Sequence, residues 1–160
     1  MSKQFDAYMA GVIDSDGSIS ICKKHITRPN PNYSVVIQLG WAATKKSLSA
    51  IKEIQKRYGG YLSFHKRSST FSKCVLVYKY QIDGQKALPM LRAIKPFLLL
   101  KKAQCDLAIK MLSTIKLGQY GGGRPKPEWL KTKQNKYAKA IRSLNTKNSG
   151  DRSGSKKALK

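Results

Sequence analysis

Acidic residues are scarce in this sequence: its 160 residues contain 8 Asp and Glu against 32 Lys and Arg, a formal net charge of +24. Long apolar runs are also missing. The densest cluster, residues 97–100, is followed by two lysines and is far shorter than the roughly 20 apolar residues that span a bilayer. The first residues carry no apolar secretory segment. The three cysteines are widely spaced and form no CxxC pair, which disfavours a disulfide framework or a cysteine zinc site. We therefore expect no membrane association and an intracellular, reducing compartment.

The excess of positive charge predicts a polyanionic partner. Nucleic acid is the first choice, because lysines and arginines that contact phosphates release condensed counterions and dominate the affinity. Charge alone leaves a ribosomal protein or a generic RNA-binding module open as alternatives. Anionic membrane surfaces rank third, because no basic amphipathic helix has a strong apolar face. The length suits one domain with a sizeable core.

Hydrophobic periodicity predicts an α-ββ-α-ββ order followed by three helices. Helices are expected at residues 5–13 and 45–58, after Asp83, from Pro96 and after Pro127. Strands are expected at residues 18–24, 33–43, 61–66 and 73–82. The apolar side chains that should face the core are Ile19, Ile21, Val35, Ile37, Leu39, Trp41, Leu62 and Phe64. We expect residues 1–145 to form a single domain and residues 146–160 a basic, disordered tail.

Two of the eight carboxylates lie two residues apart, at Asp14 and Asp16, directly after the first apolar helix. The negative end of a helix dipole disfavours anions, so this placement indicates a functional site. Two acids in a basic chain form an oxygen-rich site suited to Mg²⁺. The spacing excludes an EF-hand, because Gly17 comes too early in the loop and His25 stands where a glutamate is needed. A simple turn cap before the strand remains the alternative.

Residues 8–18 resemble the signature helix of the LAGLIDADG homing endonucleases; they read Tyr-Met-Ala-Gly-Val-Ile-Asp-Ser-Asp-Gly-Ser. The residues that depart from the pattern are Met9 and Ser15. The element order, the run from Pro96 to Lys102 and Gln104 are similar to the single-motif branch of that family, over roughly residues 5–145. The resemblance implies an α+β protein with the αββαββα homing-endonuclease fold, a curved antiparallel DNA-binding sheet and additional C-terminal helices.

The resemblance also implies an activity, namely site-specific double-strand cleavage of DNA in intron homing by metal-assisted phosphodiester hydrolysis. One motif per chain implies a homodimer that acts on a long pseudo-palindromic target. The helices of two copies would touch at an interface of Tyr8, Ala10, Gly11 and Ile13, with Ala10 and Gly11 permitting close approach. An intron RNA maturase, a monomeric nicking relative and an inactive DNA-binding protein on the same scaffold are the alternatives. The expected compartment is a prokaryotic cytoplasm, a chloroplast or a mitochondrion.

Catalytic roles follow from the same resemblance. Asp16 matches the metal-binding acid, the backbone carbonyl of Ser15 is a further ligand, and Asp14 closes the helix end. Lys101 matches the family's active-site lysine, and Lys45 stands where relatives often carry a glutamine that orients water. The implied cofactor is Mg²⁺, two or more ions per dimer active centre, with Mn²⁺ able to substitute.

Sequence reading of DNA is expected from the polar face of the sheet, because glutamine, lysine and arginine side chains can contact base edges in the major groove. The candidate DNA-binding residues are Lys24, Arg28, Gln38, His65, Arg67, Lys73, Lys79 and Gln81, with Lys139 on the last helix as a phosphate contact. Val75 and Val77 share the alternation of Lys73, Lys79 and Gln81, which leaves the register of that strand open.

Overall fold

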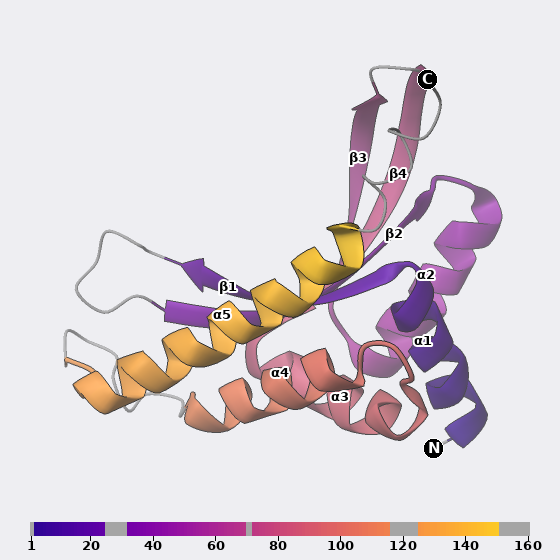
Figure 1. The fold of residues 1–160 in the computed structure, drawn as a ribbon. Coiled ribbons are helices and arrows are strands. Elements are labelled where there is room, and N and C mark those ends of the chain that lie inside the picture. Colours follow the sequence, from indigo (N-terminus) through magenta and orange to yellow (C-terminus); the bar gives the residue numbers. More distant parts are fainter. Residues whose placement is uncertain (1, 25–31, 70–71, 116–124, 151–160) are drawn as a thin grey trace, which may run out of the picture.

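A four-stranded antiparallel sheet and the helices packed on it form the computed structural model, which describes residues 2–24, 32–69, 72–115 and 125–150 (Figure 1). Its elements are α1 (Lys3–Ser15), β1 (Gly17–Lys24), β2 (Asn32–Ala42), α2 (Lys45–Tyr58), β3 (Tyr61–Ser69), β4 (Ser72–Asp83), the 3₁₀ turn η1 (Gly84–Lys86), α3 (Ala87–Ile94), the 3₁₀ turn η2 (Lys95–Phe97), α4 (Lys102–Thr114) and α5 (Glu128–Gly150). The strands lie in the order β1-β2-β4-β3. The predicted α+β class and element order are confirmed. None of the helices in these residues is long and apolar enough to cross a bilayer.

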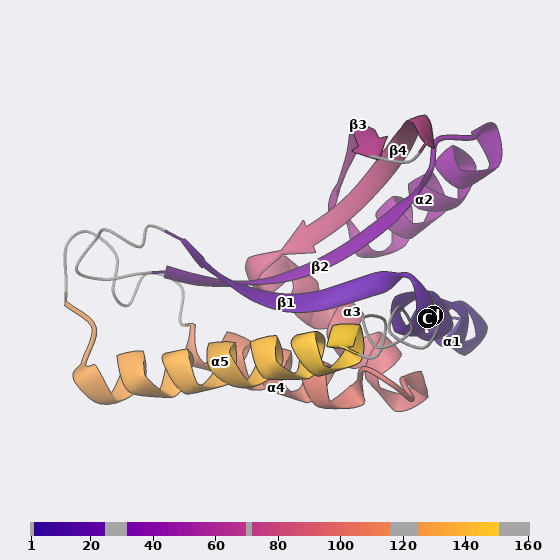
Figure 2. The same ribbon diagram turned by 45° about the horizontal axis from the view of Figure 1, so that its top comes forward.

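The helices cover one face of the sheet and leave the other free. Helices α3, α4 and α5 lie along β1 and β2, while α2 lies beside β3 and β4 (Figure 2). The core is formed by the inward side chains of the sheet and by the buried sides of helices α1 to α5; it includes Ile13, Ile19, Ile21, Val35, Ile37, Leu39, Ile51, Ile82, Met90, Leu91, Ile94, Met111 and Ile141. The alternation predicted for the first two strands therefore gives the correct buried face.

Helix α5 packs along β1, which is one of the two edge strands because it pairs with β2 alone among the described strands. The side-chain amide of Asn145 donates to the backbone oxygen of Ile19 at 3.1 Å. The helix thereby shields part of this edge from pairing with a strand of another chain. The helix continues to Gly150, past residue 145, where the sequence analysis placed the start of a disordered tail. That segment is therefore helical up to residue 150, and residues 151–160 lie outside the described part.

The start of α1 is tied to the end of α2 by a buried acid. Asp6 is 8% exposed and accepts hydrogen bonds from the Arg57 guanidinium, at 2.7 and 3.2 Å, and from the hydroxyl of Tyr58. The Arg57 guanidinium also lies over the ring of Phe5. Burial would raise the pKa of Asp6, but the hydrogen bonds from Tyr58 and Arg57 outweigh it and hold that pKa below its usual value. This network joins the first turns of α1 to the last turn of α2.

The helix that the sequence predicts from Pro96 begins six residues later, at Lys102. Pro96 lies instead in the short turn η2, and Leu98 then adopts an extended backbone with φ −71° and ψ 133°. Leu100, which would lie inside a helix that began at Pro96, is 72% exposed. The extended segment persists because its next three N–H groups bond to a carboxylate of α1 instead of serving a helix.

The hairpin of β3 and β4 projects beyond the helices that cover the rest of the sheet (Figure 1). Phe64, predicted to face the core, is 56% exposed. Its ring lies against that of Tyr78 on the neighbouring strand, with 5.5 Å between the ring centroids. The prediction was wrong because the alternation identifies a face, whereas burial also needs an element above that face. The strand register places Val77 opposite His65 and Lys79 opposite Ser63, so Val77 does share the polar face; the side chain of Val75 lies outside the described part.

Asp83 is the last residue of β4. It precedes the turn η1, and its side chain makes no capping hydrogen bond there. The carboxylate is instead paired with Lys24 of β1.

Candidate active site

The exposed end of α1 meets the start of β1 at a very tight turn. Asp16 caps the helix, and its N–H donates to the Val12 carbonyl at 2.9 Å. A Cβ at Gly17 would lie 2.6 Å from the Ile13 side chain and 2.8 Å from its Cα. Only glycine therefore lets the strand return this closely past the last helical turn. The turn presents Asp16 at the surface.

Asp14 holds this helix end against the segment before α4. Its carboxylate accepts from the backbone N–H groups of Leu99, Leu100 and Lys101, at 2.7, 3.2 and 2.9 Å. Three donors on one carboxylate offset the unfavourable position of an anion at the negative end of a helix. The structural role that the sequence analysis assigned to Asp14 is consistent with these bonds.

Lys101 turns its side chain to the same helix end. Its Nζ donates to the backbone oxygens of Ile13 and Asp14, at 2.7 and 2.5 Å. Burial lowers the pKa of Lys101, while the nearby charges of Asp14 and Asp16 act in the opposite direction. The ammonium group thus stabilises the free carbonyls of α1 and lies close to the candidate metal ligand.

Asp16 contrasts with Asp14 in having few partners. Its one hydrogen bond among the described residues comes from the indole Nε1 of Trp41, at 3.4 Å from Oδ2. Sequence reasoning missed Trp41 and assigned it to the core, since it alternates with Val35, Ile37 and Leu39. No pattern in the sequence could have found it, because the contact depends on where β2 passes α1. The carboxylate therefore remains open to a ligand.

The donors present fit Mg²⁺, which prefers carboxylate and carbonyl oxygens and retains several waters. Asp16 supplies an exposed carboxylate. The Ser15 hydroxyl bonds back to the Val12 carbonyl, which leaves the backbone carbonyl of Ser15 as its ligand atom. No group of three His, Cys, Asp or Glu side chains suited to a metal occurs in the described ranges.

Lys45 is the first residue of α2 and is exposed. The helix begins there because Thr44 forms a capping box with Ser47. Within the described residues, no hydrogen bond or ion pair joins Lys45 to Asp16, so its proposed part in water positioning stays a prediction.

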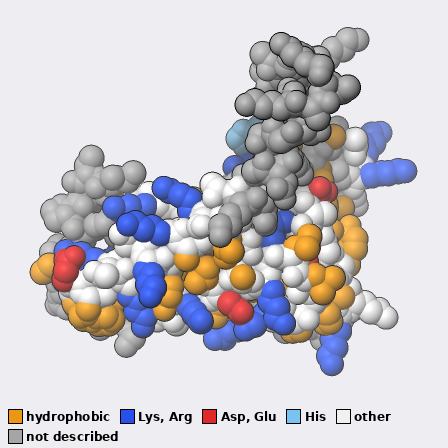
Figure 3. Space-filling view, in the orientation of Figure 1, with side chains coloured by type: hydrophobic (Ala, Val, Ile, Leu, Met, Phe, Trp, Pro, Cys, Tyr) orange, Lys and Arg blue, Asp and Glu red, His pale blue; other side chains and the backbone are white. Residues whose placement is uncertain are grey.

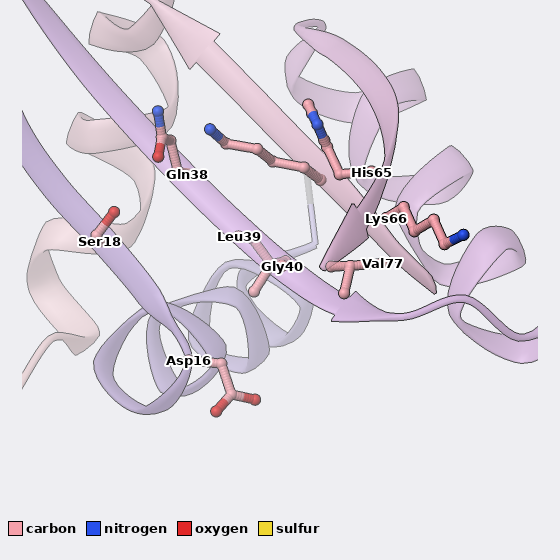
Figure 4. A pocket seen from close by; sticks show the side chains of 9 residues that line it. Asp16, Ser18, Gln38, Leu39, Gly40, His65, Lys66 and Val77 are labelled. Atoms are coloured by element: carbon pink, nitrogen blue, oxygen red, sulfur yellow. The ribbon is translucent and has the colours of Figure 1, made fainter. Parts of the chain in front are cut away.

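A hollow joins Asp16 to the polar face of the sheet. It is lined by Asp16, Ser18, Gln38, Leu39, Gly40, His65, Lys66, Val77 and Lys79, from the end of α1 and all four strands (Figure 4). The cross-strand register aligns Gln38 with Gln81, and the Gln38 amide donates to the Gln81 side chain at 2.9 Å. His65 pairs with the hydroxyl of Ser63 at 2.9 Å. These side chains place hydrogen-bond donors and acceptors side by side on one face of the sheet, as contacts with base edges require.

The structure brings most of the predicted DNA-binding residues to this face. Lys24, Gln38, His65, Lys79 and Gln81 share it by register. Arg67 and Lys73 lie on β3 and β4, but their side chains and the whole of Arg28 are outside the described part. Lys139 is exposed on α5, which packs on the opposite, helical side of the sheet (Figure 2). Basic side chains far outnumber acidic ones on the surface seen in Figure 3.

Only part of the predicted interface between two chains is exposed on the outer face of α1. Ala10 and Ile13 are fully buried in the core of the single chain, so they cannot contact a second copy directly. Tyr8 is 55% exposed, and a Cβ added at Gly11 would meet nothing within 4 Å. Close packing inside the chain therefore does not explain the glycine, and the predicted contact set reduces to Tyr8 and Gly11.

No protein-family model and no curated protein matches this sequence. Solved structures do match. The homing endonuclease I-CvuI, in complex with its target, is 18% identical with a TM-score of 0.66, covering 89% of this chain and 82% of that one. The archaeal intron-encoded homing endonuclease I-Vdi141I, complexed with DNA, is 16% identical with a TM-score of 0.64, covering 89% and 86%. The LAGLIDADG homing endonuclease I-SmaMI, bound to an uncleaved DNA target with calcium ions, is 17% identical with a TM-score of 0.61, covering 86% and 45%.

These neighbours define the class of fold. The chain has the α+β fold of the LAGLIDADG homing endonucleases, as residues 8–18 and the element order indicated. Within that fold, it spans most of I-CvuI and I-Vdi141I but less than half of I-SmaMI.

Proposed function

We propose that this chain is a site-specific DNA endonuclease of the homing type, which cuts both strands of a long pseudo-palindromic target as a Mg²⁺-dependent homodimer. The observation that carries the proposal is the exposed Asp16 carboxylate, which opens onto a hollow shared with the polar sheet face in a chain of net charge +24. The DNA-bound state of I-CvuI, I-Vdi141I and I-SmaMI supports the same function. The intron-encoded origin of I-Vdi141I supports intron homing.

The sheet would contact the bases of the DNA, and the surrounding lysines would contact its phosphates. Gln38, Gln81, Lys79 and His65 project from the free face and can donate to or accept from base edges. Exposed lysines elsewhere, including Lys139, would contact phosphates and make the affinity depend on salt. A two-stranded ribbon fits the major groove, which a curved four-stranded sheet can follow over several base pairs.

In the cleavage step, Asp16 and the Ser15 carbonyl would hold Mg²⁺, or Mn²⁺ in its place, with two or more ions in each dimer centre. Such an ion activates water and stabilises the leaving oxygen when bound. The chain's own groups would act around it. Trp41 orients the Asp16 carboxylate, Asp14 fixes the helix end, and Lys101 places a positive charge beside the phosphate. Lys45 is proposed to position the attacking water.

A homodimer would complete the centre, because one chain has a single Asp16 and cutting two strands needs two sites. The exposed face of α1 at Tyr8 and Gly11 is available to a second copy. Leu99 and Leu100 are 87% and 72% exposed beside Asp14, and they extend this face with apolar surface. The match to less than half of I-SmaMI, against most of I-CvuI, supports assembly from two chains.

A cleavage selection tests the function directly. The protein is incubated with a library of pseudo-palindromic duplexes in Mg²⁺, in Mn²⁺ and in EDTA, and the cut ends are sequenced. We expect double-strand cuts at one sequence family in either metal and none in EDTA. Duplex binding that is never followed by cleavage would contradict the nuclease assignment. Binding of intron RNA in preference to every duplex would point to a maturase instead.

A further inference from the structure

Asp83 is the one acidic residue in the four described strands. It lies on the free face, since it pairs with Val36 of β2 and is two residues from Gln81, which pairs with Gln38. A carboxylate there repels the phosphates of any bound nucleic acid. With only eight acidic residues among 160, its presence on the surface proposed to bind DNA calls for a specific role.

The partner of Asp83 is Lys24, which reaches across β2 from the end of β1. The Lys24 Nζ donates to Asp83 Oδ2 at 3.3 Å, and the two side chains remain 50% and 31% exposed. They come from strands that are not neighbours in the sheet, so the pairing depends on the fold and not on local sequence. The result is a cation and an anion side by side, both accessible from the free face.

We propose that Lys24 and Asp83 together read one G·C base pair in each half-site, with Lys24 donating to guanine and Asp83 accepting from the N4 amino group of cytosine. This inference rests on the proposed function. In the major groove, a lysine commonly contacts guanine O6 and N7, and an acidic side chain accepts from cytosine N4. Guanine O6 and cytosine N4 are joined by a Watson–Crick hydrogen bond of about 2.9 Å. Their separation is close to the 3.3 Å between the Lys24 nitrogen and the Asp83 oxygen.

The order of groups along the base pair distinguishes G·C from A·T. G·C presents two neighbouring acceptors and then a donor, so one ammonium serves both acceptors while the carboxylate takes the donor. A·T presents a donor between two acceptors, which leaves one acceptor facing the carboxylate or without a donor. An aspartate beside a lysine therefore selects G·C, whereas a lysine alone would accept several pairs.

The test is a binding selection from a random duplex library, with Ca²⁺ in place of Mg²⁺ so that bound DNA stays intact. Wild type, Asp83→Ala, Asp83→Asn and Lys24→Ala are compared. Asp106→Ala is the matched control, because Asp106 is also paired with a lysine, Lys95 at 2.6 Å, and is 37% exposed on α4. We expect wild type to prefer G·C at one pair of symmetric positions on the order of tenfold.

Asp83→Ala should remove that preference and leave the other positions unchanged, and Asp83→Asn should shift it towards adenine. Lys24→Ala should weaken the base preference at the same positions, while Asp106→Ala should select the wild-type motif. The inference is overturned if Asp83→Ala strengthens binding to all duplexes alike with an unchanged motif, since Asp83 would then only neutralise Lys24. It is equally overturned if the affected position prefers A·T. A wild-type protein that selects no motif would overturn the proposed function, and this inference with it.

Discussion

The two ends of α1 carry the same type of residue in opposite settings. At the start, Asp6 is buried and bonded to Arg57 and Tyr58. At the far end, Asp16 is exposed and receives one long hydrogen bond from Trp41. An acid with all its partners supplied contributes to stability, whereas an acid left open is available for a ligand. The helix is thus anchored at one end and chemically free at the other.

Both roles, anchoring the helix and binding a ligand, occur at the far end of α1, where Asp14 is bonded and Asp16 is open. The Asp14 carboxylate is as fully bonded as that of Asp6, but its donors are backbone N–H groups of the segment before α4. The anchoring function therefore exists at both ends of the helix, and Asp16 is the carboxylate that anchoring does not use. Substitutions along α1 should separate folding, assembly and chemistry.

Asp16→Asn should have the largest effect. We expect cleavage to fall by at least about a hundredfold, because a neutral amide is a poor ligand for a divalent cation. Thermal stability and duplex binding in Ca²⁺ should stay close to wild type. Cleavage kinetics, melting curves and gel shifts measure the three properties. Normal cutting by this variant would remove Asp16 from the active site.

Gly11→Leu should disrupt assembly without harming the fold. The added side chain projects from a face where a Cβ meets nothing in the single chain, and leucine favours helix more than glycine does. At a contact between two copies, overpacking costs about 1–3 kcal/mol per site and arises twice in a symmetric dimer. We expect a monomer by sedimentation with an unchanged or higher Tm. An intact dimer would place the interface elsewhere.

Asp14→Ala should lower stability before it affects binding. Loss of the carboxylate that accepts from three N–H groups is expected to destabilise the fold by about 1–3 kcal/mol, which corresponds to a fall in Tm of roughly 2–12 °C. The segment holding Leu99 to Lys101 should exchange its amide hydrogens faster, as mass spectrometry can show. Unchanged exchange there would mean that Asp14 does not hold that segment.

Asp6→Asn should destabilise the protein by about 1–2 kcal/mol at neutral pH, because charge-assisted hydrogen bonds from Arg57 and Tyr58 become neutral ones. The pKa of Asp6 is lowered in the folded state, so its contribution is present above the unfolded value of about 4 and is lost as pH falls through the folded value. The difference in unfolding free energy between wild type and variant should therefore shrink below pH 4. A constant difference across pH 3–7 would contradict this account.

Trp41→Phe should have the smallest effect. The indole bond to Asp16 is long, so we expect the Mg²⁺ concentration for half-maximal cleavage to rise only about three- to tenfold, with binding in Ca²⁺ unchanged. Trp129→Phe, on the exposed surface of α5, is the matched control. In that control protein Trp41 is the remaining tryptophan, and its fluorescence should respond to Mn²⁺ unless Asp16 is also replaced by Asn. No response would exclude a metal beside Trp41.

Features that depend on residue type and short-range spacing could be recognised from the sequence. Asp14 and Asp16 were visible because acids are rare and their place after an apolar helix is unfavourable. The inward positions of β1 and β2 followed from alternation, and the predicted helix at residues 45–58 has the bounds of α2. The burial of Ala10 and Ile13 in the chain's own core could not be foreseen, since the motif does not say which side of α1 that core occupies.

The sequence by itself determined the element order, the acidic helix end and the basic surface, because each depends on residue type and on spacing along the chain. The tertiary structure alone decided that Trp41 meets Asp16, that Lys101 turns to the carbonyls of α1, and that Lys24 pairs with Asp83. Each of those contacts joins elements distant in sequence. The packing of α1 against β1 and η2 and the order of strands in the sheet bring these groups within hydrogen-bond reach. Neither feature is encoded in a local sequence period.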